Sequence, residues 1–217
     1  MKKRDVKQLR TAIGVLGAFL LWTVAVCVVD VQAIGPKGTK VGLAGLNGFF
    51  RDLTGVHMAL YTITDWLSLI PVAFALGFAG LGLEQWIRRK NIWKVDFGIL
   101  ALGGFYIVVM AVYFLFEFMV INYRPVLIEG VLEVSYPSST TVLVICVMLT
   151  AKLQLHGRIK TPVIRLGVEV LIYAFALFMV VARLVSGVHW ITDIIGGVLL
   201  SAGLVLLYDV ITKVKSR

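Results

Sequence analysis

The sequence contains few charged residues: Asp, Glu, Lys and Arg make up 15% of its 217 residues, whereas a soluble domain has about a quarter. Apolar residues make up 59%, and the mean hydropathy is +0.94. A chain with so little polar surface argues against a soluble enzyme, and its high apolar content argues against a disordered protein. The apolar stretches are long and unbroken, unlike the short alternating strands of a membrane barrel. The composition therefore predicts an all-α integral membrane protein.

Cysteine is also scarce. Cys27 and Cys146 both fall inside apolar runs, and their separation fits neither a metal site nor a disulfide framework. We expect two buried, inert thiols, and we expect neither a metal nor another cofactor. The chain has no low-complexity tract and no convincing internal repeat, so we treat residues 1–217 as one membrane domain.

Six stretches approach the roughly 20 mostly apolar residues that a spanning helix needs. Their approximate bounds are Thr11–Val29, Met58–Trp86, Phe97–Met119, Thr141–Leu155, Val163–Val185 and His189–Ile211. The Gly-rich segment from Asp30 to Gly55 contains Pro36 and predicts a long loop or a re-entrant stretch. Pro71 is expected to bend the second span. The sequence predicts a six-transmembrane-helix bundle.

The positive charges are distributed asymmetrically along the chain. If the N-terminus is cytoplasmic, the segments on that side hold sixteen of the 21 Lys and Arg residues, including Arg217. This distribution predicts that both termini are cytoplasmic. The net positive charge then reflects topology and contact with anionic headgroups, so we expect a bilayer and no nucleic acid as the partner. The basic N-terminus precedes a long apolar run without a small-residue cleavage site, which favours a retained helix. This feature, the short loops and the small size favour a bacterial plasma membrane.

One polar cluster falls between the fifth and sixth spans, where the topology predicts the outer membrane face. It contains Arg183, Ser186, Gly187, His189 and Asp193. His189 and Asp193 are four residues apart, so on a helix they share one face. A carboxylate at one ring nitrogen fixes the tautomer and leaves the other nitrogen nucleophilic, and a guanidinium suits phosphate oxygens. A structural His–Asp pair, with Arg183 as an interfacial anchor, is the alternative.

A second cluster flanks the third and fourth spans on the same predicted side. Arg124 precedes Pro125, which favours an extended backbone. Pro137 precedes Ser138, Ser139 and Thr140, a pattern typical of a helix N-terminus that either caps the helix or holds an anion. Charged residues at membrane depth are costly and mark function unless a partner explains them.

These residues resemble three signatures of the phosphatidic acid phosphatase type 2 and vanadium haloperoxidase superfamily. The signatures are Lys-x6-Arg-Pro, Pro-Ser-Gly-His and Ser-Arg-x5-His-x3-Asp. Arg124-Pro125 is similar to the end of the first, and residues 137–140 resemble a degenerate second. Ala182-Arg183 through His189 to Asp193 resembles the third. The motif region covers about residues 117–193.

The resemblance implies a membrane lipid phosphatase of the hydrolase class that needs no metal. The family pattern implies that His189 forms a phosphohistidine and that Asp193 orients it. Arg124, Arg183, Ser138, Ser139 and Thr140 would hold the phosphate, with charge stabilised by arginines and helix N–H groups. The substrate would be a phosphorylated membrane lipid, bound at the outer face. The oligomeric state is left open.

Two departures bear on the chemistry. The Lys of the first signature aligns with Glu117, and the His of the second aligns with Thr140. In the family this histidine protonates the leaving group, whereas Thr140 cannot titrate near neutral pH. Glu117 would weaken anion binding unless it is protonated or pairs with Arg124.

Since a phosphate leaving group needs little acid assistance, we favour a polyprenyl diphosphate substrate. Glu129, Glu133 and His57 remain possible replacement acids. A catalytically silent member that binds lipid phosphate is the alternative, and a small transporter is a more distant one.

Overall fold

The computed structural model describes residues 2–215, and all the regular elements within this range are helical. The α-helices are α1 (Lys3–Val28), α2 (Ala44–Thr54), α3 (Met58–Leu67), α4 (Leu69–Arg89), α5 (Phe97–Met119), α6 (Ser139–Arg158), α7 (Pro162–Val185) and α8 (Ile191–Lys215), with 3₁₀ turns at Pro36–Gly38 and Ile92–Lys94. In this range, six spans are long and apolar enough to cross a membrane, with α3 and α4 together forming the second. The predicted all-α six-transmembrane bundle is confirmed. Arg217 lies outside the described residues.

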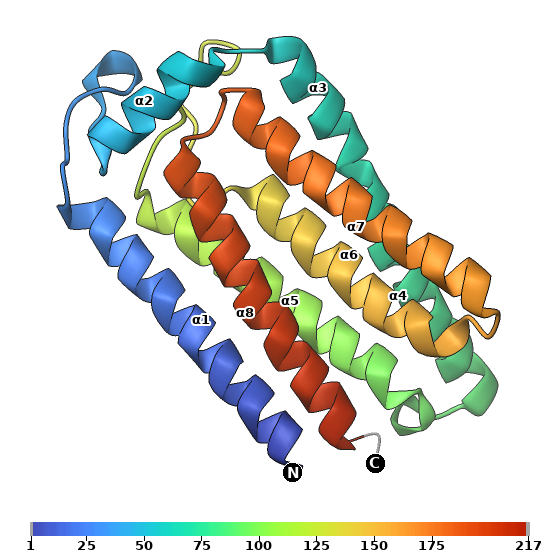
Figure 1. Ribbon diagram of the computed structural model, residues 1–217. Coiled ribbons are helices and arrows are strands. Elements are labelled where there is room, and N and C mark those ends of the chain that lie inside the picture. The colour runs from blue at the N-terminus through green and yellow to red at the C-terminus, as the bar shows by residue number, and fades with distance from the viewer. Residues whose placement is uncertain (1, 216–217) are drawn as a thin grey trace.

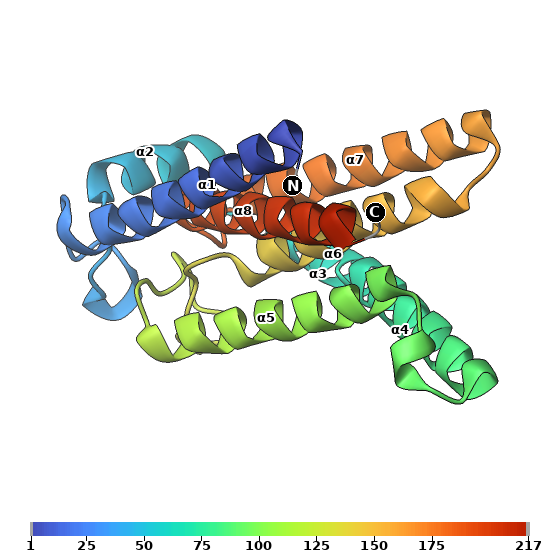
Figure 2. The same ribbon diagram turned by 90° about the horizontal axis from the view of Figure 1, so that it is seen from below.

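The bundle has two distinct ends. Figure 1 shows α1 beginning and α8 ending at one end, while the α5–α6 loop and the α7–α8 turn lie at the other. Helices α6 and α8 are central: 56% of the most apolar window of each is buried, against 28% or less in the other spans. Seen from below, α1, α8 and α7 lie on one side of α6, and α4 and α5 lie on its other side (Figure 2). The two most buried helices thus support the loop-bearing end.

Several boundaries differ from those expected. Helix α1 begins at Lys3, because the polar first turns extend the apolar helix beyond the membrane segment. The expected loop or re-entrant stretch contains α2 and returns to the bundle. The second span is interrupted at Ser68 rather than bent at Pro71. Pro71 has no N–H for the carbonyl of Leu67 and crowds it, so the break falls one turn earlier.

The loop-bearing ends of α6 and α8 approach closely because α8 carries two glycines there. A Cβ on Gly196 would lie 2.8 Å from the Tyr136 ring, and a Cβ on Gly197 would lie 3.0 Å from Thr141. Tyr136 packs against Phe19 and Phe116. The backbone of α8 therefore passes directly beside the first turn of α6, which brings residues distant in sequence to one site.

The outward faces are apolar, as expected for contact with lipid. Phe118 is 84% exposed and Leu171 is 70% exposed. The expectation of two buried thiols is wrong for one of them: both cysteines are free, but Cys27 is exposed and Cys146 is buried. Helix α1 packs mainly on α8, and Val26 is buried on the side of α1 that faces the bundle. Cys27 is the next residue along the helix and therefore faces outward.

Candidate phosphate-binding site

The α7–α8 turn positions His189. Gly187 has a φ of +68°, and a Cβ there would lie 1.9 Å from the Gly55 carbonyl oxygen. Only glycine meets both demands. The backbone N–H of His57 donates to the Ser186 carbonyl at 2.9 Å, which ties the turn to the segment before α3. His189 therefore lies before α8, not within it as the expected sixth span placed it.

Asp193 is held by the first turn of α8. Its Oδ2 accepts the backbone N–H of Trp190 at 3.0 Å, and its Oδ1 accepts the Asn122 side-chain amide at 3.3 Å. A carboxylate at this third helical position both caps the helix start and lies at the positive end of its dipole. Oδ2 also lies 3.6 Å from His189 Nδ1. Asp193 and His189 are thus buried close together, although His189 precedes the helix on which the spacing argument placed both residues.

Arg124 connects the α5–α6 loop to the imidazole. Its Nη1 donates to His189 Nε2 over 3.1 Å. A guanidinium has donors only, so Nε2 must accept with its lone pair and the ring proton is on Nδ1, toward Asp193. This contact defines a neutral imidazole whose lone pair faces a cation.

The surroundings of His189 favour that neutral form. His189 is 4% exposed, and burial holds its pKa well below the ordinary value, with the charges of Arg124 and Arg183 acting in the same direction. Protonation would place a third positive charge beside two guanidinium groups without solvent to screen it. The ring is therefore kept in the form that can act as a nucleophile.

Arg183 and Arg124 both pack on the ring of Tyr61. The guanidinium carbons of Arg183 and Arg124 lie 4.8 Å and 5.8 Å from the centre of Tyr61. Arg183 donates to Thr64 Oγ1 at 3.2 Å, and its buried Nε has no hydrogen-bond partner among the described residues. Buried donors are nearly always paired, and an unpaired guanidinium N–H fits an anionic oxygen. The structure brings Arg124, Arg183 and His189 together.

The start of α6 supplies the remaining predicted residues. Ser138 caps the helix, accepting the backbone N–H of Thr141 at 3.4 Å, and its own N–H donates to the Asp193 carbonyl. This capping is the alternative that the sequence offered for Ser138. Ser139 and Thr140 line a neighbouring cavity of about 360 Å³ between α4, α5 and α6. The lining of this cavity includes Ser135 but not Arg124, Arg183 or His189, so Ser139 and Thr140 are not grouped with the arginines and the imidazole.

The residue that pairs with Arg124 is Glu133, at 2.9 Å from Nε, and not Glu117. Backbone pairing within the α5–α6 loop explains this choice. Tyr123 and Val134 form an antiparallel bridge, and the Arg124 N–H donates to the Glu133 carbonyl at 2.9 Å, so Arg124 and Glu133 face each other across the loop. Among the candidate replacement acids, Glu133 is therefore the one that forms an ion pair with Arg124. Its place follows from loop pairing that the sequence alone did not indicate.

Four other contacting residues were missed as site residues. Tyr61 and Thr64 project from α3, and Asn122 bonds Asp193. Ser135 approaches the His189 ring with its backbone and the Asp193 carboxylate with its side chain. Asn122 lies two residues before Arg124 in the sequence. Tyr61 and Thr64 carried no sequence signal, because only the packing of α3 on α7 brings them to Arg183.

A buried imidazole, a carboxylate and two guanidinium groups at one end of an apolar helical bundle define a class: an integral membrane protein with a site suited to a phosphate group. Residues 72–216 match the PAP2 superfamily. The chain belongs to this superfamily, and it is thus a membrane protein of the phosphatase type.

The fold is similar to the crystal structure of a transmembrane PAP2-type phosphatidylglycerolphosphate phosphatase from Bacillus subtilis. The TM-score is 0.60 at 17% identity, over 94% of this chain and 96% of the other. No curated protein matches the sequence.

Proposed function

We propose that the protein hydrolyses a phosphorylated membrane lipid at the outer membrane face through a phosphohistidine at His189. The observation that carries this proposal is the 3.1 Å contact between Arg124 and His189 Nε2, beside the buried Arg183. It joins a neutral nucleophile to two cations that match phosphate oxygens. The positive charges of the loops at the opposite end support the outward orientation of the site.

In the proposed reaction, the guanidinium groups of Arg124 and Arg183 bind the substrate phosphate. Arg124 then bonds phosphate oxygen in place of His189 Nε2, and the freed lone pair attacks phosphorus opposite the leaving oxygen. As the imidazole gains positive charge, the Asp193 carboxylate near Nδ1 stabilises it. The Arg124, Arg183 and α6 N-terminal N–H groups offset the developing negative charge on the phosphoryl oxygens.

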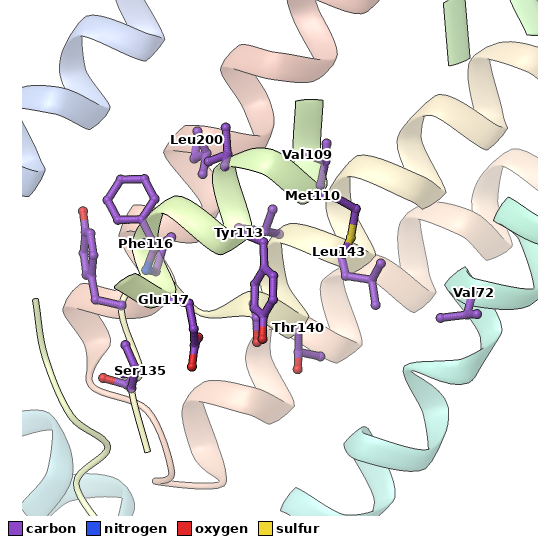
Figure 3. Close-up of a pocket in the computed structure, with 16 residues that line it drawn as sticks. Val72, Val109, Met110, Tyr113, Phe116, Glu117, Ser135, Thr140, Leu143 and Leu200 are labelled. Atoms are coloured by element: carbon purple, nitrogen blue, oxygen red, sulfur yellow. The ribbon is translucent and has the colours of Figure 1, made fainter. Parts of the chain in front are cut away.

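The lipid portion has a suitable place next to this phosphate. The cavity beside α6 is lined mainly by apolar side chains, among them Val109, Met110, Leu143 and Leu200 (Figure 3). Ser135 borders both this cavity and the His189–Asp193 pair. We infer that the first part of a lipid chain occupies the cavity while its phosphate meets the arginines.

A polyprenyl diphosphate is the favoured substrate, because its phosphate leaving group departs without a strong acid. Thr140 cannot supply a proton near neutral pH. We expect purified protein in detergent to release phosphate from farnesyl diphosphate at least about tenfold faster than from phosphatidic acid.

Phosphate release assays with both lipids at equal surface concentration test this preference. A preference for phosphatidic acid would contradict the assignment of a diphosphate. Release from neither lipid, with retained binding of inorganic phosphate, would instead identify a silent lipid-phosphate-binding protein.

A further inference from the structure

The cavity beside α6 has a polar end and an apolar end. Figure 3 shows the oxygen atoms of Ser135, Glu117, Tyr113 and Thr140 gathered toward one side of the cavity, away from Val109 and Leu200. The polar end begins at Ser135, which also borders His189. In the reaction proposed above, on which this inference rests, the leaving oxygen lies between the phosphate and the lipid chain, at this polar end.

Few groups there can give up a proton. The hydroxyls of Ser135, Ser139 and Thr140 do not titrate near neutral pH. Tyr136 also lines the cavity, but its hydroxyl bonds Thr23 in the core at 2.7 Å. This leaves Glu117 and Tyr113, and a carboxyl group is the stronger acid of the two.

Glu117 is free for this role. Glu133 bonds Arg124, whereas Glu117 has no ion-pair partner within residues 2–215. It projects from the last turns of α5, the helix that forms one wall of the cavity. No cation among these residues therefore competes with a ligand in the cavity for the Glu117 carboxyl group.

We propose that Glu117 is the general acid for lipid phosphomonoesters. His189 Nε2 forms a bond to phosphorus while the P–O bond to the lipid breaks, and its electron pair goes to the leaving oxygen. That oxygen takes the Glu117 proton, and the lipid leaves as an alcohol. Water then attacks the phosphohistidine, giving its proton to the Glu117 carboxylate, and the P–N electron pair returns to the imidazole. Phosphate leaves and Glu117 is protonated again.

An acid at Glu117 extends the substrate range beyond diphosphates, and the two substrate classes therefore respond differently to its loss. In Glu117→Gln, we expect release from phosphatidic acid to fall about 100-fold or more, the usual range for a lost general acid. Release from farnesyl diphosphate should stay within about threefold of wild type, because a phosphate leaving group needs little acid assistance. Glu117→Asp should retain more phosphatidic acid activity than Glu117→Gln.

Phosphate release by the purified full chain in detergent measures both rates. Glu84→Gln, near the far end of α4 where the exposed Glu84 pairs with Arg88, is the matched control and should leave both rates unchanged. An equal loss on both lipids, no loss on phosphatidic acid, or a selective loss in Tyr113→Phe would overturn the role of Glu117. Wild type that cleaves only the diphosphate would also overturn it while leaving the proposed function intact. Wild type that cleaves neither lipid would overturn both.

Discussion

His189→Ala is expected to abolish phosphate release from farnesyl diphosphate, with a loss of about 10⁴-fold or more, because it removes the nucleophile that carries the reaction. The neighbouring groups explain why no other side chain replaces it. Arg124 and Arg183 offer only donors, and Asp193 is buried and bonded to Trp190 and Asn122. The steady-state rate of phosphate release measures the effect.

His156→Ala is the matched control for this substitution. His156 lies in the last turn of α6 and bonds Glu169, at the end of the bundle that carries the termini. Its loss should leave the rate unchanged. If His189→Ala kept the wild-type rate while His156→Ala did too, the phosphohistidine mechanism would fail.

Arg183→Gln is expected to lower kcat/KM by about 10²- to 10³-fold, the usual cost of one lost donor to transition-state charge. Arg183 is 1% exposed, its Nε has no partner among residues 2–215, and it packs on Tyr61. The amide keeps a donor toward Thr64 but loses the charge and the forked geometry. Arg183→Lys keeps the charge only, and should also lose most of the activity, because a point charge does not reproduce the bidentate contact.

A thermal transition measured for each variant separates loss of function from loss of fold. Arg88→Gln is the control, since Arg88 is an exposed cation near the other end of the bundle that pairs with Glu84. Near-wild-type kcat/KM in Arg183→Gln would show that only one arginine binds the phosphate.

The helices of this fold are predictable because apolar length determines them. A membrane-spanning segment must satisfy its backbone internally, so the apolar runs locate the spans to within several residues. The errors arise where polar residues extend a helix, as at the start of α1, or where a loop carries its own short helix, as in Ala44–Thr54. Pro71 indicated an irregularity in the second span. The position of the break depends on which backbone carbonyl Pro71 crowds.

The site was partly predictable because its main groups lie in two local patterns. The spacing of His189 and Asp193 and the turn at Gly187 are sequence features, and Arg124 and Arg183 stand beside recognisable breaks. Tyr61, which both arginines contact, comes from a helix distant in sequence. Glu133 reaches Arg124 through pairing within a loop. Such contacts depend on tertiary packing and have no periodicity.

The central claim is that one imidazole, aided by two guanidinium groups, takes the phosphoryl group from the lipid. The most direct test is to mix purified protein with farnesyl diphosphate labelled in the terminal phosphate, quench the reaction in alkali within milliseconds, and map the labelled peptide. The account predicts acid-labile label on His189 in the wild type and in Glu117→Gln, and none in His189→Ala. Phosphate release without any label on His189 would contradict it.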